Sequence, residues 1–176
     1  MALPGLRLDP LPAFNYQVTL IDASSLLGKV MTGISLVVGG GFSECSGLDG
    51  TLQVEEYNEG GENSYVHKFP TRMTYANIVL KRGVGLSEDL WNWHFDYVRG
   101  QGKRRDGLIT LQNEMQLPIK LWKFKRGLPL KWSGPTFNAT QNAVAIESLE
   151  IVHEGLELIS PGTVLAQASA ALSSAF

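Results

Sequence analysis

The sequence lacks most of the features that mark disulfide-linked, metal-binding and membrane proteins. Cys45 is its only cysteine, which excludes an intrachain disulfide and any cysteine-based metal cluster. The histidines, His67, His94 and His153, do not form a spaced metal motif such as H-x-x-x-H. No apolar run approaches the roughly 20 residues that span a bilayer, and residues 1–9 lack the basic and apolar regions of a secretory signal. We therefore expect a soluble protein with no metal, no cofactor and no membrane insertion.

Patterns typical of catalysis are missing as well. The glycines at 39–41 are not followed by the lysine and helix of a phosphate-binding loop. No pattern of a nucleophilic cysteine surrounds Cys45, which suits a small buried apolar side chain. The acidic residues around Glu55 and Glu59 lack the ligand order of a calcium-binding loop. The sequence therefore predicts no catalytic residues and no enzymatic activity.

The charges nearly balance but are segregated along the chain. The formal net charge is −2, which gives little reason to expect a dedicated nucleic-acid-binding protein. Eleven of the fifteen lysines and arginines lie between Lys81 and Lys131, whereas residues 30–67 hold six acidic residues and no basic one. Two interpretations stay open. In the first, these charged residues are ordinary solvated surface. In the second, one face of a subunit meets an oppositely charged face of another copy.

Turn residues and short alternating segments predict a mainly β fold. The chain holds 19 glycines and 8 prolines, and residues 14–21 alternate apolar and polar side chains, as in a strand with one buried face. Pro70 is expected to end the pairing near it, and Pro129 and Pro135 to confine an extended piece at 130–132 to a sheet edge or a loop. The other expected strands are 30–38, a segment from 42, 51–57, 75–82, 108–113, 119–125 and 144–158.

One segment predicts an α-helix, at about 87–99. Ser87 can cap its start, with two acids in the first turn where the helix dipole favours them, and Gly100 can supply a left-handed stop. Because Trp91 and Phe95 are four residues apart, we expect both side chains to be largely buried on one side of the helix. The apolar and aromatic positions assigned to that side are Leu90, Trp91, His94, Phe95 and Val98.

Several short sequence segments, taken together and in their order, resemble those of a known protein family. They are 41–48 (GFSECSGL), 56–61 (EYNEGG), 78–83 (IVLKRG), 90–93 (LWNW), 132–135 (WSGP) with 138–139 (NA), 144–150 (VAIESLE) and 153–156 (HEGL). This order and content resemble the tail-tube protein family of contractile-tailed phages, which includes the Hcp-like tube subunits of extracellular contractile injection systems. The resemblance covers about residues 12–158; a longer segment at 24–40 and the C-terminal tail depart from it. We expect one domain over 1–159 and a flexible Ala- and Ser-rich tail over 160–176.

The resemblance implies a β-sandwich or barrel with one helix and an extended β-hairpin, in which hairpins of neighbouring subunits close a barrel around a lumen. It implies a structural subunit that forms stacked hexameric rings and meets itself, a sheath protein and baseplate or spike proteins. Such tubes are assembled in the cytoplasm and act in a virion tail or in an extracellular or cytoplasmic injection particle, with DNA or an effector protein as cargo. The sequence does not distinguish phage tail from injection machine, DNA from protein cargo, or main ring from baseplate-proximal ring.

Candidate assembly residues follow from this resemblance and from the charge pattern. Thr51, Gln53 and Glu55 form one face of a strand that is polar enough to line a water-filled channel. The acidic stretch 55–62 is expected to meet a basic stretch of an adjacent subunit, either 103–105 or 120–126. Candidate inter-subunit contacts are Glu55, Glu59, Glu62, Lys103, Arg104, Arg105, Lys123 and Lys125. The alternative function is a monomeric β-sandwich module that binds carbohydrate or another ligand on exposed tryptophans.

Overall fold

The structure is a computed structural model that describes residues 13–22, 41–61 and 63–160. Within these ranges the chain forms two antiparallel sheets and one helix. The elements are β1 (Tyr16–Asp22), β2 (Glu44–Ser46), β3 (Gly50–Tyr57), β4 (His67–Tyr75), β5 (Ile78–Gly83), α2 (Asp89–Val98), β6 (Arg105–Gln112), β7 (Pro118–Ser133), β8 (Ile146–Val152) and β9 (Gly155–Ile159). No helix of the described part is long and apolar enough to cross a membrane. The fold is mainly β with one helix, as the sequence predicts.

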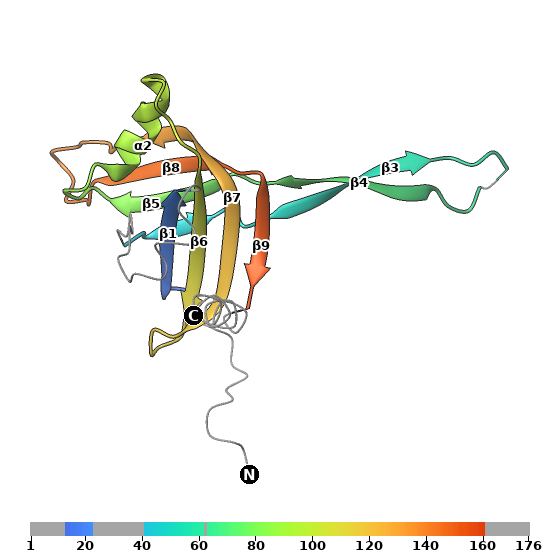
Figure 1. Cartoon of the computed structure of the whole chain (residues 1–176), viewed down its shortest axis with the longest axis horizontal. Helices are drawn as coiled ribbons and strands as arrows, with labels where there is room; N and C mark the ends of the chain where they lie inside the picture. The colour runs from blue at the N-terminus through green and yellow to red at the C-terminus, as the bar shows by residue number, and fades with distance from the viewer. Residues whose placement is uncertain (1–12, 23–40, 62, 161–176) are drawn as a thin grey trace, which may run out of the picture.

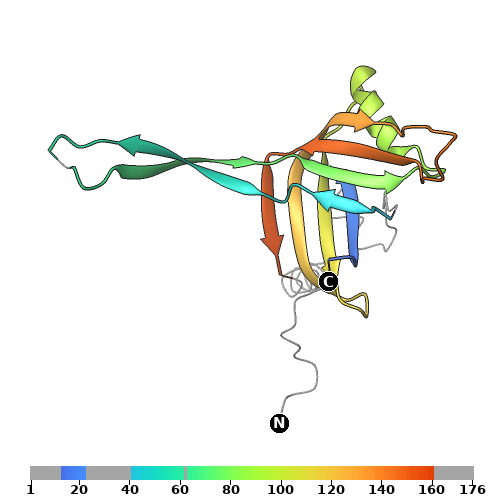
Figure 2. The ribbon, with the colours of Figure 1, turned by 180° about the vertical axis from the view of Figure 1, so that it is seen from behind.

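The larger sheet forms two layers that share the long strand β7. Its strand order is β1-β6-β7-β8-β5-β2, and β9 also pairs with β7. The first half of β7 pairs with β6 and β9, and the second half, from Leu128, pairs with β8. Strands β1, β6 and β9 of the first layer run across β5 and β8 of the second (Figures 1 and 2). β7 passes between the layers at Arg126, whose φ of 53° is left-handed and bends the strand.

The core lies between the two layers and is built from alternate side chains of their strands. Val18 and Leu20 of β1 are buried and Gln17 is exposed, as predicted, whereas Phe14, expected on the buried face, lies before β1 and is 81% exposed. Ile109 lies opposite Val18, and Phe124 is fully buried. The other buried apolar residues of this cluster are Ile78, Leu80, Leu90, Trp93, Leu149 and Ile151.

Helix α2 presents a different side to the core from the one that the sequence predicts. Leu90 and Trp93 are buried, and Tyr97 packs beside them. Trp91 and Phe95 are partly buried, and their rings stack on each other with centroids 3.8 Å apart. Neither is as deeply buried as Leu90 and Trp93, so the predicted pair lies at the side of the stripe that faces the core. Leu90, Trp93 and Tyr97, at positions i, i+3 and i+7, face the core. Compared with the predicted stripe, the buried side of the helix is rotated by about one residue around the helix axis.

The ends of α2 are partly as predicted. The helix begins at Asp89, and Glu88 takes the N-cap position without a side-chain cap. The Ser87 hydroxyl, one residue earlier than a cap, accepts the Asp89 backbone N–H at 3.4 Å and donates to the Asp89 carboxylate. Gly100 has a φ of 74° and ends the helix in the predicted left-handed conformation. Val98, expected on the buried side, is 75% exposed.

Two strand predictions are corrected by the pairing. Pro70 does not end the hairpin, because β4 continues through it; it lies opposite Val54 beside a register shift, where a missing N–H is tolerated. Segment 144–158 forms two strands, β8 and β9. The piece 130–132 is the end of β7, which has only β8 beside it among the described strands, at a sheet edge as predicted. The expected strand 30–38 and residues 161–176 of the expected tail lie outside the described residues.

Candidate assembly surfaces

Strands β3 and β4 form a two-stranded hairpin, here called the arm, that leaves the body of the molecule. The arm pairs with no other described strand, and it projects past β9 in both views (Figures 1 and 2). All eight residues of β3 are exposed, as are all but the first and last of β4. Because a lone two-stranded hairpin is marginally stable in water, an arm of this length needs a surface to lie on.

The two faces of the arm have different chemistry. Leu52 lies opposite Met73, and Val54 opposite Pro70; Leu52 and Val54 are 54% and 51% exposed. The other face carries the predicted channel-lining residues Thr51, Gln53 and Glu55. There the Gln53 amide donates to the Thr74 hydroxyl at 3.3 Å, and the Thr74 hydroxyl donates to the Thr51 carbonyl oxygen at 3.2 Å. The arm is therefore amphipathic, with an uncovered apolar side.

Aromatic rings gather on the polar face toward the far end of the arm. The ring of His67 lies 5.0 Å from that of Tyr65, 6.2 Å from that of Phe69 and 6.5 Å from that of Tyr57. Its Nε2 atom lies 3.1 Å from a carboxylate oxygen of Glu59. Glu59, a predicted inter-subunit contact, thus has a partner in its own chain, and Glu62 lies outside the described residues.

The root of the arm is held in one orientation by close packing. Gly47 has a φ of 88°, and a Cβ atom at this position would lie 2.0 Å from the carbonyl oxygen of Asn77. The side chain of Asn77 donates to the Glu150 carboxylate at 2.7 Å. His153, buried in the corner between β8 and β9, places one ring nitrogen 3.1 Å from the Ala76 carbonyl oxygen and the other 3.1 Å from that of Gly155. Sequence reasoning missed this joint, because His153 lies inside the single strand expected over 144–158 and nothing local connects it with Gly47.

The first layer has two open edges. Among the described strands, β1 pairs only with β6, and β9 pairs only with β7. Each edge therefore presents backbone N–H and C=O groups that another strand could pair with. The sequence gives no indication of these edges, because strand order depends on contacts between distant segments.

The basic stretch 120–126 is largely paired within its own chain. Lys123 lies 3.7 Å from Asp106, and Arg126 lies 2.8 Å from Glu154. Lys125 forms an ion pair with Glu157, and the hydrogen bond from Lys125 lowers the pKa of that carboxyl. Arg104 also reaches Glu154, at 2.8 Å. Three of the predicted contact residues, Arg104, Lys123 and Lys125, thus have intramolecular partners.

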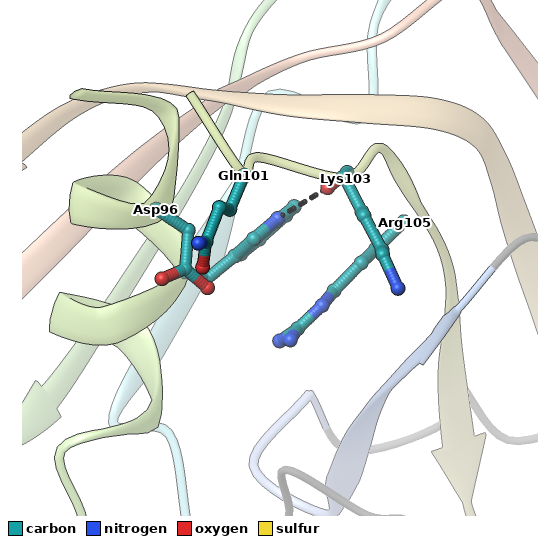
Figure 3. A pocket seen from close by; sticks show the side chains of 5 residues that line it. Asp96, Gln101, Lys103 and Arg105 are labelled. Atoms are coloured by element: carbon teal, nitrogen blue, oxygen red, sulfur yellow. Dashed lines mark hydrogen bonds between the residues drawn. The ribbon is translucent and has the colours of Figure 1, made fainter. Parts of the chain in front are cut away.

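The other basic stretch lines a surface hollow at the end of α2. The hollow has a volume of about 560 Å³ and is lined by Trp93, Asp96, Gln101, Lys103 and Arg105. The Trp93 indole N–H donates to the Lys103 carbonyl oxygen at 2.9 Å, shown as a dashed line in Figure 3. The guanidinium carbon of Arg105 lies 5.2 Å from the centre of the Trp93 ring. Stacking on the ring fixes this cation beside the hollow.

A buried ion pair in the second layer also contacts the segment just before α2. Arg82 donates to the Glu147 carboxylate at 2.6 Å, and both residues are less than 10% exposed. The Trp132 indole donates to the same carboxylate at 3.0 Å, and Arg82 also donates to the Ser87 carbonyl oxygen at 3.0 Å. Both carboxylate oxygens of Glu147 and two nitrogens of Arg82 therefore have partners, and such hydrogen bonds help a buried ion pair to be stable.

Groups suited to chemistry do not converge in the described part of the chain. No three His, Cys, Asp or Glu side chains gather there as ligands for a metal ion. Burial raises the pKa of the Cys45 thiol to about 11, so the thiol is protonated and a weak nucleophile at neutral pH. The prominent features of the described surface are instead the arm, the open edges and the hollow.

These are the features of a self-assembling structural protein built on a β-sandwich. The model of the T4-like virus tail tube protein gp19 family matches residues 12–157, so the chain belongs to this tail-tube family and is a tube subunit. The family is one of structural tube proteins. The comparison with curated proteins finds no match.

Several solved structures share this fold, among them a chain of an extracellular contractile injection system. A chain of the anti-feeding prophage (AFP) baseplate, 6-fold symmetrised, is 25% identical with a TM-score of 0.74, covering 86% of this chain and 97% of that one. A chain of the PVC sheath-tube complex in the extended state is 22% identical with a TM-score of 0.68, over 86% and 92% of the two chains. Hcp1 from Flavobacterium johnsoniae is 15% identical with a TM-score of 0.53, over 84% and 96%.

Proposed function

We propose that this chain forms rings of six copies that stack into a hollow tube. The observation that carries the proposal is the first layer, a four-stranded sheet with open edges at β1 and β9. Pairing of β1 of one copy with β9 of the next would continue the sheet and, on closing a ring, leave no free edge. The AFP baseplate that contains a similar chain is 6-fold symmetrised, which supports six copies.

The arm is the second assembly element in this proposal. Its apolar side, around Leu52 and Val54, lies on a neighbouring copy, and its polar face with Thr51, Gln53 and Glu55 faces the water-filled lumen. Charged residues of the arm and of the basic stretches contribute to the contacts between copies. These candidates are Glu55, Glu59, Glu62, Lys103, Arg104, Arg105, Lys123 and Lys125. Exposed pairs of this kind contribute only about 0–1 kcal/mol each, so apolar and main-chain contacts dominate.

The tube has a contractile sheath and a baseplate as partners in this proposal. Similar chains occur in a PVC sheath-tube complex and in an AFP baseplate, which supports both partners. The tube assembles in the cytoplasm and acts in a virion tail or an extracellular injection particle, with DNA or an effector protein in its lumen. No enzymatic step is part of this function.

Mass measurement on the purified protein tests the proposal. At micromolar concentration, light scattering or native mass spectrometry should give six chain masses and integer multiples of that ring. A protein that stays monomeric at every concentration, with baseplate proteins present as well, contradicts the proposal. A monomer that binds carbohydrate would instead support a ligand-binding β-sandwich.

A further inference from the structure

We infer that the apolar side of the arm lies against an apolar patch of the next copy, at the end of the second layer where β5 ends and β8 begins. This surface, here called the end patch, consists of Val84, Leu86, Val144 and Ile146, whose side chains are all exposed. The inference rests on the proposed ring and names the surface that receives each arm. The partner is a second copy of this chain.

The end patch is a continuous surface formed by two neighbouring strand ends. Gly83, the last residue of β5, pairs with Ile146, the first residue of β8. Just beyond them the Val84 N–H donates to the Ala145 carbonyl oxygen at 2.9 Å. A Cβ atom at Gly83 would lie 3.6 Å from a methyl group of Val144, so this side chain lies beside the end of β5. Backbone pairing therefore holds the patch in place before any partner arrives.

The arm is apolar on this side only in the half that is nearest to the body. Leu52 lies opposite Met73 there, and Val54 follows on the same side. Farther out the side becomes charged, because Glu56 comes next and its carboxylate lies 3.3 Å from the Lys68 ammonium. An apolar surface that receives the arm must therefore lie close to the root of the arm.

The layout of the ring brings the end patch of one copy to the arm root of another. The arm ends at Tyr75 and β5 begins at Ile78, so β5 connects the arm root with the end patch. The arm leaves the body on the side of β9, and β5 runs to the side of β1 (Figures 1 and 2). The six residues of β5 span about 20 Å, and four strands about 4.8 Å apart occupy about 19 Å. Pairing of β9 with β1 of the next copy therefore shifts that copy by about the length of β5.

A second group of exposed apolar residues is unsuited to receive the arm. Phe14 lies just before β1, and Met115 and Leu117 lie in the turn between β6 and β7. This turn is at the end of the first layer away from α2 (Figures 1 and 2). In a closed barrel the strands run along the axis with a tilt of about 35–45°, so this end faces along the tube. The arm instead runs across the strands of the first layer, toward the end patch.

Chemical cross-linking of paired cysteines tests the contact. In a Cys45→Ala background, Leu52→Cys with Ile146→Cys should give a ladder of covalent multimers with a short bis-maleimide. The matched control pairs Leu52→Cys with Met115→Cys, also an exposed apolar position, and should stay largely uncross-linked. Electron micrographs of the same samples before cross-linking report whether rings are present. Rings without a Leu52–Ile146 ladder, or an equal ladder in the control, would overturn the inference and leave the proposed function intact.

A charge placed in the end patch provides the second part of the test. Val144→Asp should lower the yield of rings several-fold, because it brings a carboxylate into an apolar contact, whereas Met115→Asp should leave the yield of rings unchanged. Both positions are exposed, so the two variants should unfold at the same temperature as the unsubstituted chain. An undiminished yield of rings from Val144→Asp contradicts the contact. Absence of rings in the unsubstituted protein contradicts the proposed function itself, and the inference with it.

Discussion

The Nε2 atom of His153 lies 3.1 Å from the carbonyl oxygen of Ala76, and this contact joins the corner of β8 and β9 to the root of the arm. The two residues are 77 positions apart in the sequence. The other ring nitrogen faces Gly155, and the ring packs 5.4 Å from Tyr75. The direction of the arm is therefore fixed by a side chain of the body, and not by the hairpin alone.

Replacing His153 should loosen the arm. His153→Ala removes the partner of a carbonyl in a largely buried corner, which costs about 1–3 kcal/mol in the free energy of unfolding. Hydrogen exchange should also speed up in β3 and β4. His94→Ala is the matched control, because His94 contacts the Pro129 carbonyl oxygen at 3.2 Å, away from the arm. Equal rates of hydrogen exchange in β3 and β4 of the two variants would show that His153 does not position the arm.

Glycine at position 47 should be required at the joint. Gly47→Ala places a Cβ atom 2.0 Å from the Asn77 carbonyl oxygen at a φ of 88°. The backbone conformation alone costs on the order of 1–3 kcal/mol, and the clash adds to it. Gly60→Ala, in the loop of the arm where nothing lies within 4 Å, should be tolerated. Thermal unfolding of the two variants compares them, and equal midpoints would mean that the joint yields easily.

The buried ion pair between Arg82 and Glu147 should be sensitive to the loss of one partner. Glu147→Ala leaves the Arg82 guanidinium buried without its counter-charge, which costs about 3–5 kcal/mol in denaturant unfolding. The control is Glu44→Ala, which breaks an exposed ion pair in which the Lys81 ammonium lies 2.9 Å from the Glu44 carboxylate. This variant should lose less than about 1 kcal/mol in the free energy of unfolding. Similar losses in both variants would indicate that water reaches Arg82.

The buried side of α2 can be checked by truncating its apolar residues in turn. Leu90→Ala should cost about 2–5 kcal/mol, because Leu90 is 1% exposed and the cavity lies in the core. Phe95→Ala should cost clearly less, since this ring is less deeply buried than Leu90 and stacks on Trp91. A larger loss for Phe95 than for Leu90 would restore the stripe expected from sequence.

Local patterns in the sequence predicted much of the fold, and long-range contacts account for what they missed. The alternation around Val18 and the stop at Gly100 were read correctly, because each depends on neighbours within a few residues. The most deeply buried side of α2 depends on β7, and for that reason Trp93 was missed and the exposed Val98 was included. The passage of β4 through Pro70 depends on a register shift against β3 that no local signal specifies.

The same distinction applies to the candidate assembly residues. The polar face of Thr51, Gln53 and Glu55 follows from a period of two, and the structure places these residues together on the arm. Which lysines and arginines have partners could not be predicted, because Arg104 and Arg126 meet Glu154 only once β9 lies beside β7. Their roles between subunits stay predictions.

Cryo-electron microscopy of the purified protein tests the central claim most directly. The account predicts closed rings with six-fold symmetry around an open channel, in which β1 of each copy pairs with β9 of its neighbour and each arm lies on an adjacent subunit. Monomers, or rings in which both edges of the first layer and the apolar side of the arm face solvent, would contradict it.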